Sequence, residues 1–425
     1  MGEDLAGRLG GRDGLAYGAS FLFGLCMYSS IVSLFPALDA LRPALLTSGV
    51  AAGAFVLRRL VQREHVGLDG RRGMALVALC VLAFVSQSWS VFPKATQDYA
   101  TELAKDAAIC LVIAQVVTNA ARLKAILIAC LVGGLAPAWY SFQNYVNGTH
   151  LIDGGRARWE GIYLDPNHMA MAMVFLVPVG ITLVLRGRGL WRVLGAVSVL
   201  GSLTAIAVSA SRGGALGLSL TCLIWAAREK QRARTLSLFA VVVLLFLAFS
   251  PKSFWNRTQT IGDYQTDVSA LGRVHAWQVG RAISADKPLL GAGAGAFLYA
   301  WPLYAPVEAR GQAYVAHNIF LAMIGELGWV GFFLFLAFVA SSLSAAYRAA
   351  DAPVGGPWIR AIFAGACGYV LCDMSSGYVT SAHFFFIFGL LSASARIREF
   401  ERTALVASVS EAPTAADSVL AEGAA

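Results

Sequence analysis

The chain has 425 residues, of which 57% are hydrophobic and only 14% are charged. This balance excludes a soluble globular protein of this size, because soluble domains carry about 25% charged residues. The formal net charge of +8 would suit a nucleic-acid partner. The basic residues, however, lie where the topology of a membrane protein would place them, so we expect no nucleic-acid partner.

Apolar segments that reach or approach the roughly 20 residues needed to span a bilayer recur along the chain. We expect about twelve spans, each of them helical, because lipid offers no partner to unpaired backbone groups. The expected spans are Leu15–Ala37, Pro43–Leu57, Gly73–Trp89, Asp106–Thr118, Leu123–Val146, Asn167–Leu185, Val193–Val208, Gly213–Ala227, Leu236–Ser250, Asn318–Ala346, Ile359–Met374 and Ser381–Ala395. The fold class is therefore an all-α polytopic membrane protein forming one domain, residues 1–425, with a retained first helix rather than a cleavable signal peptide.

Most of the 33 Lys and Arg residues fall in short loops on alternate sides of these spans. With both termini in the cytoplasm, this alternation satisfies the rule that basic loops stay inside. The long interval 251–317, between the ninth and tenth spans, is then external, because long segments escape the charge rule. Residues 400–425 are rich in Ala, Ser and Glu and are expected to form a disordered cytoplasmic tail.

The seven cysteines lie within or at the ends of expected spans, so the sequence predicts no disulfide framework. No CxxC motif and no Cys/His cluster with metal-ligand spacing is present. These cysteines are Cys26, Cys80, Cys110, Cys130, Cys222, Cys367 and Cys372.

Two arginines, Arg156 and Arg158, lie in an external loop that leads to Asp165-Pro166. Aspartate before proline is a favourable helix start, because an N-cap acceptor precedes proline at the first helical position. Either arginine could bind phosphate, whereas a loop arginine can also simply be exposed; we favour function for at least one. For His168, one turn inside the span, a hydrogen-bonded interfacial histidine is a simpler interpretation than catalysis.

Arg212 stands at the head of a span, in the short external turn Ser209–Gly214. An arginine in this position can extend to lipid headgroups. The neighbouring glycines, however, allow another group to approach the backbone, and a helix N-terminus favours anions. We therefore predict an anion site at Arg212.

Within the long interval, Leu271–Ser284 reads as an amphipathic helix on which Arg273 and Trp277 share a face. The planar guanidinium of arginine suits phosphate oxygens, while contact with lipid headgroups is the competing interpretation, mainly for Arg281. The glycine-rich stretch Gly291–Gly295 could form a phosphate nest, but a flexible turn is the better interpretation. No P-loop or dinucleotide motif accompanies it.

His317 opens the tenth span, next to Asn318 and near Tyr314. It could simply be a hydrogen-bonded residue at a helix end, but its ordinary pKa near neutrality suits a general base. Glu326 and Asp373 are acids inside expected spans and are secondary candidates, because acids within a membrane are costly. Hydrogen bonding between helices would explain both acids nearly as well.

These pieces, taken in order, resemble the O-antigen ligase and polymerase superfamily, in particular bacterial O-antigen ligases. The resemblance extends from about Arg156 to Leu391 and rests on Asp-Pro-Asn, Ser-Arg-Gly-Gly, Gly-Arg-x-x-x-Trp, Lys-Pro-Leu-Leu-Gly-x-Gly and His-Asn-x-x-Leu-x-x-x-Gly-Glu-Leu-Gly. It implies catalytic roles for Arg212, Arg273 and His317. The substrate-binding candidates are Arg156, Arg158, Asn167, Trp277, Arg281, Tyr314 and Asn318.

The resemblance implies a bacterial inner-membrane enzyme that works on the periplasmic face. Its donor would be a glycan on undecaprenyl pyrophosphate, and a ligase would transfer that glycan to a sugar hydroxyl of lipid A–core. No Asp-x-Asp motif occurs in the sequence, so we expect arginines instead of a metal and no cofactor. A polymerase or protein O-glycosyl ligase would share the same arginines and histidine, and a transporter is the alternative of another class.

Overall fold

The computed structural model describes residues 13–64, 70–152, 155–229, 232–259, 268–376 and 381–410. These residues are largely helical, and the only β-pairing among them is an isolated bridge between Ile152 and Arg156. The helices are α2 Gly14–Ser29, α3 Ile31–Leu34, α4 Pro43–Val61, α5 Gly70–Val85, α6 Pro93–Val116, α7 Ala120–Asn147, α8 Pro166–Arg186, α9 Leu190–Val208, α10 Arg212–Arg228, α11 Arg232–Phe249, α12 Lys252–Gln259, α13 Val268–Asp286, α14 Phe297–Tyr304, α15 Ile319–Ala349, α16 Gly356–Ser376 and α17 Ala382–Ser410. Short 3-10 turns are η1 Pro36–Leu41, η2 Ser86–Ser88, η3 Gly161–Tyr163 and η5 Val307–Ala309. The all-α class expected from the sequence is therefore observed in this part of the chain.

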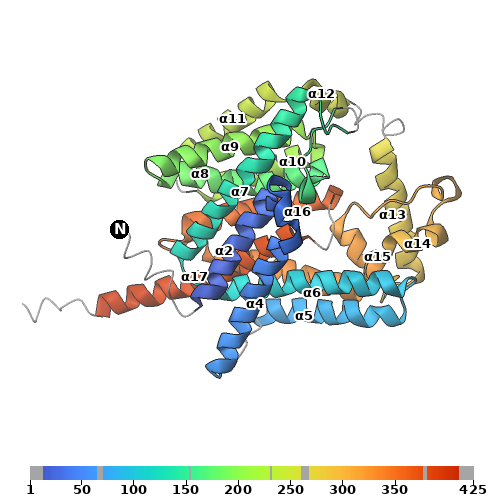
Figure 1. Ribbon diagram of the computed structural model, residues 1–425, viewed down its shortest axis with the longest axis horizontal. Coiled ribbons are helices and arrows are strands. Elements are labelled where there is room, and N and C mark those ends of the chain that lie inside the picture. Colours follow the sequence, from blue (N-terminus) through green and yellow to red (C-terminus); the bar gives the residue numbers. More distant parts are fainter. Residues whose placement is uncertain are drawn as a thin grey trace, which may run out of the picture.

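The long helices pack side by side, and α8 lies among α9, α10 and α16 (Figure 1). From Met169 to Leu183 every residue of α8 is buried, which explains its apolar sequence on all sides. A helix of this kind occupies the interior of a bundle, and its first residues reach the end where the candidate site residues gather.

Six helical segments in the described part are long and apolar enough to cross a membrane. They are Pro36–Val61, Gly70–Ser88, Ala120–Asn147, Pro166–Arg186, Leu190–Val208 and Ile319–Ala349. The other expected spans coincide with α2, α6, α10, α11, α16 and α17, which are helices but are not among these six. The chain is thus a multi-pass helical membrane protein, while the expected number of twelve spans stays a prediction.

The structure differs from expectation at α6. The span expected here begins at Asp106, but one continuous helix runs from Pro93 to Val116 beside α5 (Figure 1). Its buried residues Thr96, Ala100, Leu103 and Ala107 recur at helical spacing, so the charged half packs on the bundle as well. The charges lie on the exposed side and pair with one another within the helix: Lys94 with Asp98 and Lys105 with Glu102.

The long interval 251–317 contains α12, α13 and α14, which lie at one end of the bundle (Figure 1). The expected helix Leu271–Ser284 falls inside α13. Near the C-terminus, α17 continues to Ser410, into the stretch 400–425 for which a disordered tail was expected. Residues 411–425 of that tail lie outside the described residues.

Candidate functional site

A hydrogen-bonded cluster joins three segments that are distant in the sequence. Arg156 is buried, with 3% of its surface exposed, and its Nε donates to the Ser209 carbonyl oxygen at 2.9 Å. Its Nη2 donates to Asn167 Oδ1 at 2.7 Å, and Ser211 Oγ donates to the same oxygen at 2.9 Å. A buried guanidinium needs such acceptors to offset the loss of water. The loop before α8, the start of α8 and the α9–α10 turn therefore meet at Arg156.

Both helices at this cluster begin with a side-chain cap, and the cap at Asp165 is the one expected from the sequence. Asp165 accepts a hydrogen bond from Asn167 N at 2.7 Å, and Pro166 occupies the first turn of α8. Ser211 accepts from Gly214 N at 3.1 Å, which makes Arg212 the first residue of α10. Arg212 therefore adds its charge to the positive end of a helix, the arrangement predicted for an anion site.

The turn before α10 is conformationally strained. Ala210, between Ser209 and Ser211, has φ of 47°, and His317 has φ of 48°. Residues with a Cβ rarely adopt this left-handed region, and such strain persists only where the surrounding structure holds it. Two strained positions therefore occur at the candidate site, one in the α9–α10 turn and one directly before α15.

His317 is largely buried directly before α15, and its electrostatic surroundings connect the long interval to the start of α8. Burial, and next the positive charge of Arg273 on α13, lower the pKa of His317 to about 4. Asp165 acts on the same imidazole in the opposite direction, and His168 lowers the pKa further. Asp165 and His168 flank Asn167, so His317 and Arg273 lie at the same end of the bundle as the Arg156 cluster. At neutral pH the imidazole is uncharged and can accept a proton.

Tyr314 and Asn318 hold the segment around His317 in place. The Tyr314 ring packs on Gly272, where an added Cβ would lie 2.8 Å from Tyr314 Cε1. The glycine before Arg273 is therefore required by this close approach. Asn318 caps α15, because its Oδ1 accepts from Phe320 N at 3.0 Å and from Leu321 N at 3.2 Å. These contacts give both residues a positioning role.

Three other candidates lie at the margin of the site. Arg158 Nη1 donates to the Leu164 carbonyl oxygen at 2.9 Å, which stabilises the loop before α8. Trp277 is 48% exposed, and Arg281 is also exposed on α13. The structure therefore does not bring Arg158, Trp277 or Arg281 into the hydrogen-bonded cluster around Arg156.

The glycine-rich stretch packs against α15. Ala292 N and Gly293 N donate to the carbonyl oxygens of Gly325 and Glu326, each at 2.9 Å. Gly295 N donates to Glu326 Oε2 at 2.9 Å. These N–H groups are engaged within the protein, so the stretch is not a phosphate nest, and Glu326 has a structural partner.

Asp373 lies in α16 with none of its surface exposed. Neither of its carboxyl oxygens has a hydrogen-bond partner among the residues that the structure describes. One turn further along, the Ser376 carbonyl oxygen lies 2.9 Å from His168 Nε2. The interpretation of His168 as a hydrogen-bonded histidine agrees with this contact.

Ser211 and Asp165 were not among the predicted site residues. The sequence carried a signal for each, since both are capping residues directly before a helix that bears a candidate residue. The Asp165 side chain fixes the start of α8 at Asn167, and the Ser211 side chain fixes the start of α10 at Arg212. Capping residues next to a proposed site are thus themselves candidates for positioning it.

Fold and site together define a multi-pass helical membrane protein in which Arg156, Arg212 and Arg273 lie at the same end of the bundle as the partly buried His317. Residues 196–336 match the family model described as O-antigen ligase, and no curated protein matches the chain. The match supports membership of the chain in the O-antigen ligase and polymerase superfamily, a class of glycosyltransferase-like enzymes. It includes Arg212, Arg273 and His317, whereas Arg156 and Asn167 lie outside it. The family also indicates a lipid-linked glycan as the class of substrate.

Proposed function

We propose that the chain is an O-antigen ligase, which transfers a glycan from undecaprenyl pyrophosphate to a sugar hydroxyl of lipid A–core. The observation that carries the proposal is the electrostatic proximity of the two halves of the site. His317, at the end of the long interval, lies within electrostatic reach of Asp165 and His168, and Asn167 between them holds Arg156. A general base and fixed cations are the two components that this transfer requires.

In the proposed reaction, His317 accepts the proton of the acceptor hydroxyl as its oxygen attacks the anomeric carbon. The bond between that carbon and the pyrophosphate oxygen breaks, and the electron pair leaves with the prenyl pyrophosphate. Attack from the face opposite the leaving group inverts the anomeric centre. The proton on His317 then passes to water or to the departing phosphate, which restores the neutral base.

Cations at this end of the bundle would stabilise the departing pyrophosphate. Arg212 combines its own charge with the N-terminus of α10, and Arg273 contributes a second charge close enough to His317 to depress its pKa. Negative charge increases on the pyrophosphate as the bond breaks, so fixed cations stabilise the transition state more than the bound donor. Arginines would then perform the role that a divalent metal performs in other sugar transferases, and we propose that the reaction is metal-independent.

The decisive experiment gives purified protein a lipid-linked glycan together with one acceptor at a time. Transfer to lipid A–core supports the ligase, elongation of the donor glycan indicates a polymerase, and transfer to a pilin-like protein indicates a protein ligase. Movement of the intact donor across a vesicle membrane without transfer would favour a transporter. Full activity in the presence of a chelator is expected, and loss of activity would contradict metal independence.

A histidine variant separates chemistry from folding. His317→Ala should lower transfer by about 10²–10⁴-fold, the usual contribution of a general base. The variant should purify with the thermal stability of the wild type. Transfer at the wild-type rate would contradict the assignment of His317 as the base.

A further inference from the structure

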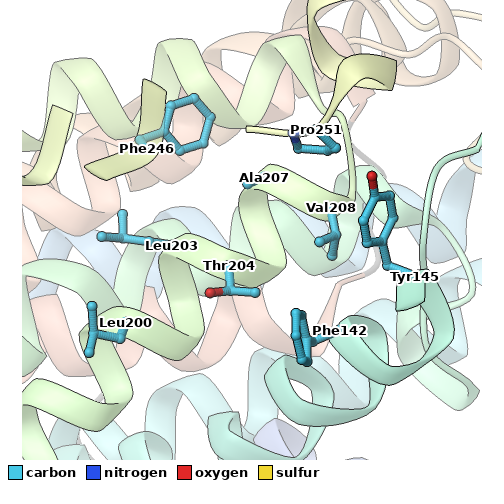
Figure 2. A pocket seen from close by; sticks show the side chains of 9 residues that line it. All are labelled: Phe142, Tyr145, Leu200, Leu203, Thr204, Ala207, Val208, Phe246 and Pro251. Atoms are coloured by element: carbon cyan, nitrogen blue, oxygen red, sulfur yellow. The ribbon is translucent and has the colours of Figure 1, made fainter. Parts of the chain in front are cut away.

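We propose that an apolar cavity between α7, α9 and α11 binds the donor lipid. The part of the prenyl chain that lies nearest the pyrophosphate would occupy it. This inference rests on the proposed function and specifies where its lipid-linked donor is held. The cavity has a volume of about 160 Å³. It is lined by Phe142 and Tyr145 of α7, Leu200, Leu203, Thr204, Ala207 and Val208 of α9, Phe246 of α11 and Pro251 (Figure 2).

The cavity has an open side and a closed end. Phe142 and Leu200 are 41% and 54% exposed, so one side of the cavity faces the lipid that would surround the bundle. Ala207 and Val208 are buried, and Figure 2 shows Pro251 and Tyr145 beside them. From Leu200 to Val208 the helix rises about 12 Å, at about 1.5 Å per residue. A chain can therefore enter sideways from the bilayer and run along α9 towards its end.

The closed end of the cavity adjoins the hydrogen-bonded cluster around Arg156. The Val208 carbonyl oxygen accepts from Ala157 N at 2.9 Å, and the next carbonyl, of Ser209, accepts from Arg156 Nε at 2.9 Å. On the other side, Pro251 begins the segment of Ser253, whose Cβ lies 3.8 Å from the position of a Cβ added at Gly155. A ligand that fills the cavity would thus end beside Arg156.

This arrangement favours one occupant. The lining is aliphatic and aromatic, with only the Thr204 hydroxyl and the Tyr145 phenol as polar side-chain groups. An apolar chain gains free energy there by leaving the more loosely packed bilayer for a shaped protein surface. The guanidinium of Arg156 beyond the closed end selects a chain that carries an anionic head directly at its terminus, as a prenyl pyrophosphate does. A phospholipid acyl chain instead ends in an uncharged ester.

The test fills the cavity and compares two donors that carry the same glycan through a pyrophosphate, one on a long prenyl chain and one on a methyl group, which is too short to enter the cavity. Thr204→Trp should raise the KM for the long-chain donor about tenfold or more. The KM for the methyl donor should change much less. Val81→Trp, at an exposed position of α5 that does not line the cavity, is the matched control and should alter neither value. Equal KM values for the long-chain donor in Thr204→Trp and wild type would overturn the proposal.

A second measurement uses the wild-type protein and does not depend on the variant folding. A prenyl pyrophosphate with a photoreactive group on its second isoprene unit should label Leu203 or Phe142. Unlabelled prenyl phosphate should suppress the labelling, and a tenfold excess of phosphatidylglycerol should not. Suppression by phosphatidylglycerol, or labelling elsewhere, would overturn the proposal. Specific labelling without any glycan transfer by the wild type would instead contradict the proposed function and leave the cavity assignment standing.

Discussion

Arg156 Nη2 lies 2.7 Å from Asn167 Oδ1, and this contact fastens the loop before α8 to the first turn of that helix. Ser211, the cap of α10, donates to the same amide oxygen. One asparagine oxygen therefore determines the position of two segments that carry arginines. Because the Arg156 guanidinium is buried, an N–H group that loses the Asn167 oxygen as its acceptor does not gain a hydrogen bond to bulk water in exchange.

Asn167→Ala should impair transfer without removing any group that reacts. Loss of a hydrogen bond to a buried charged group costs about 1–3 kcal/mol, which corresponds to about a tenfold to hundredfold lower kcat/KM if the loss falls on the active arrangement. Asn167→Asp keeps an acceptor oxygen and should retain much more activity. Steady-state kinetics of both variants with the same donor provides the measurement.

Arg158→Ala serves as the matched control for this cluster. Arg158 is two residues from Arg156 but binds only the Leu164 carbonyl oxygen among the contacts described above. A hydrogen bond at a partly exposed position contributes about 0.5–1.5 kcal/mol, so less than a tenfold effect is expected. A loss of kcat/KM in Arg158→Ala as large as that in Asn167→Ala would contradict a specific role for the contact between Arg156 and Asn167.

The pH dependence of kcat/KM should report the environment of His317. With a pKa of about 4 the imidazole is neutral, and competent as a base, throughout the range above that value. Activity that depends on the neutral form is therefore retained at pH 6 and lost as the pH falls through about 4. Arg273 lowers this pKa, so Arg273→Gln should move the acid limb to higher pH, whereas Arg273→Lys should keep it low.

The pH profile separates an electrostatic effect of Arg273 from a purely structural one. Arg273→Gln should also reduce the rate, because a cation is lost, but a reduced rate alone does not identify the cause. An acid limb at the same pH in Arg273→Gln and wild type would contradict the electrostatic coupling of these two residues.

Arg212 and Arg281 offer a comparison between a cation at the site and one at the margin. Arg212 begins α10 beside Ser211, and Arg281 is exposed on α13. Removing one group that stabilises developing charge typically costs about 10²–10³ in kcat. Arg212→Ala should therefore lose transfer by this factor, while Arg281→Ala should stay within a few-fold of wild type. Equal kcat values in Arg212→Ala and Arg281→Ala would contradict the anion site.

Much of this organisation follows from local sequence. The caps of α8 and α10 were predictable, because Asp-Pro and Ser before a helix satisfy exposed N–H groups wherever they occur. The burial of Arg156 was not, since its acceptors come from Asn167 and from the Ser209 backbone, which only the fold brings near. The charged first half of α6 lay outside the expected span for a related reason. Its residues pair with one another on one side, which leaves a buried apolar stripe that composition alone does not reveal.

Glu326 illustrates the same limit, since its position suggested function and its contacts indicate structure. Its Oε2 accepts from Gly295 N, and its backbone oxygen accepts from Gly293 N, so the residue ties the glycine-rich stretch to α15. Two residues on, Gly328 has φ of 64° and interrupts the regular helix, and directly after it Trp329 N and Val330 N donate to the carbonyl oxygens of Pro288 and Leu289.

Glu326→Gln should consequently preserve both folding and transfer, because the amide oxygen can still accept from Gly295 N. Glu326→Leu removes the acceptor and should destabilise the protein by about 1–3 kcal/mol, the cost of leaving a buried donor unsatisfied. Thermal unfolding in detergent measures the stability, and transfer assays on the same preparations measure the activity. Glu326→Gln that folds normally but transfers no glycan would show that a carboxylate is needed for the chemistry itself.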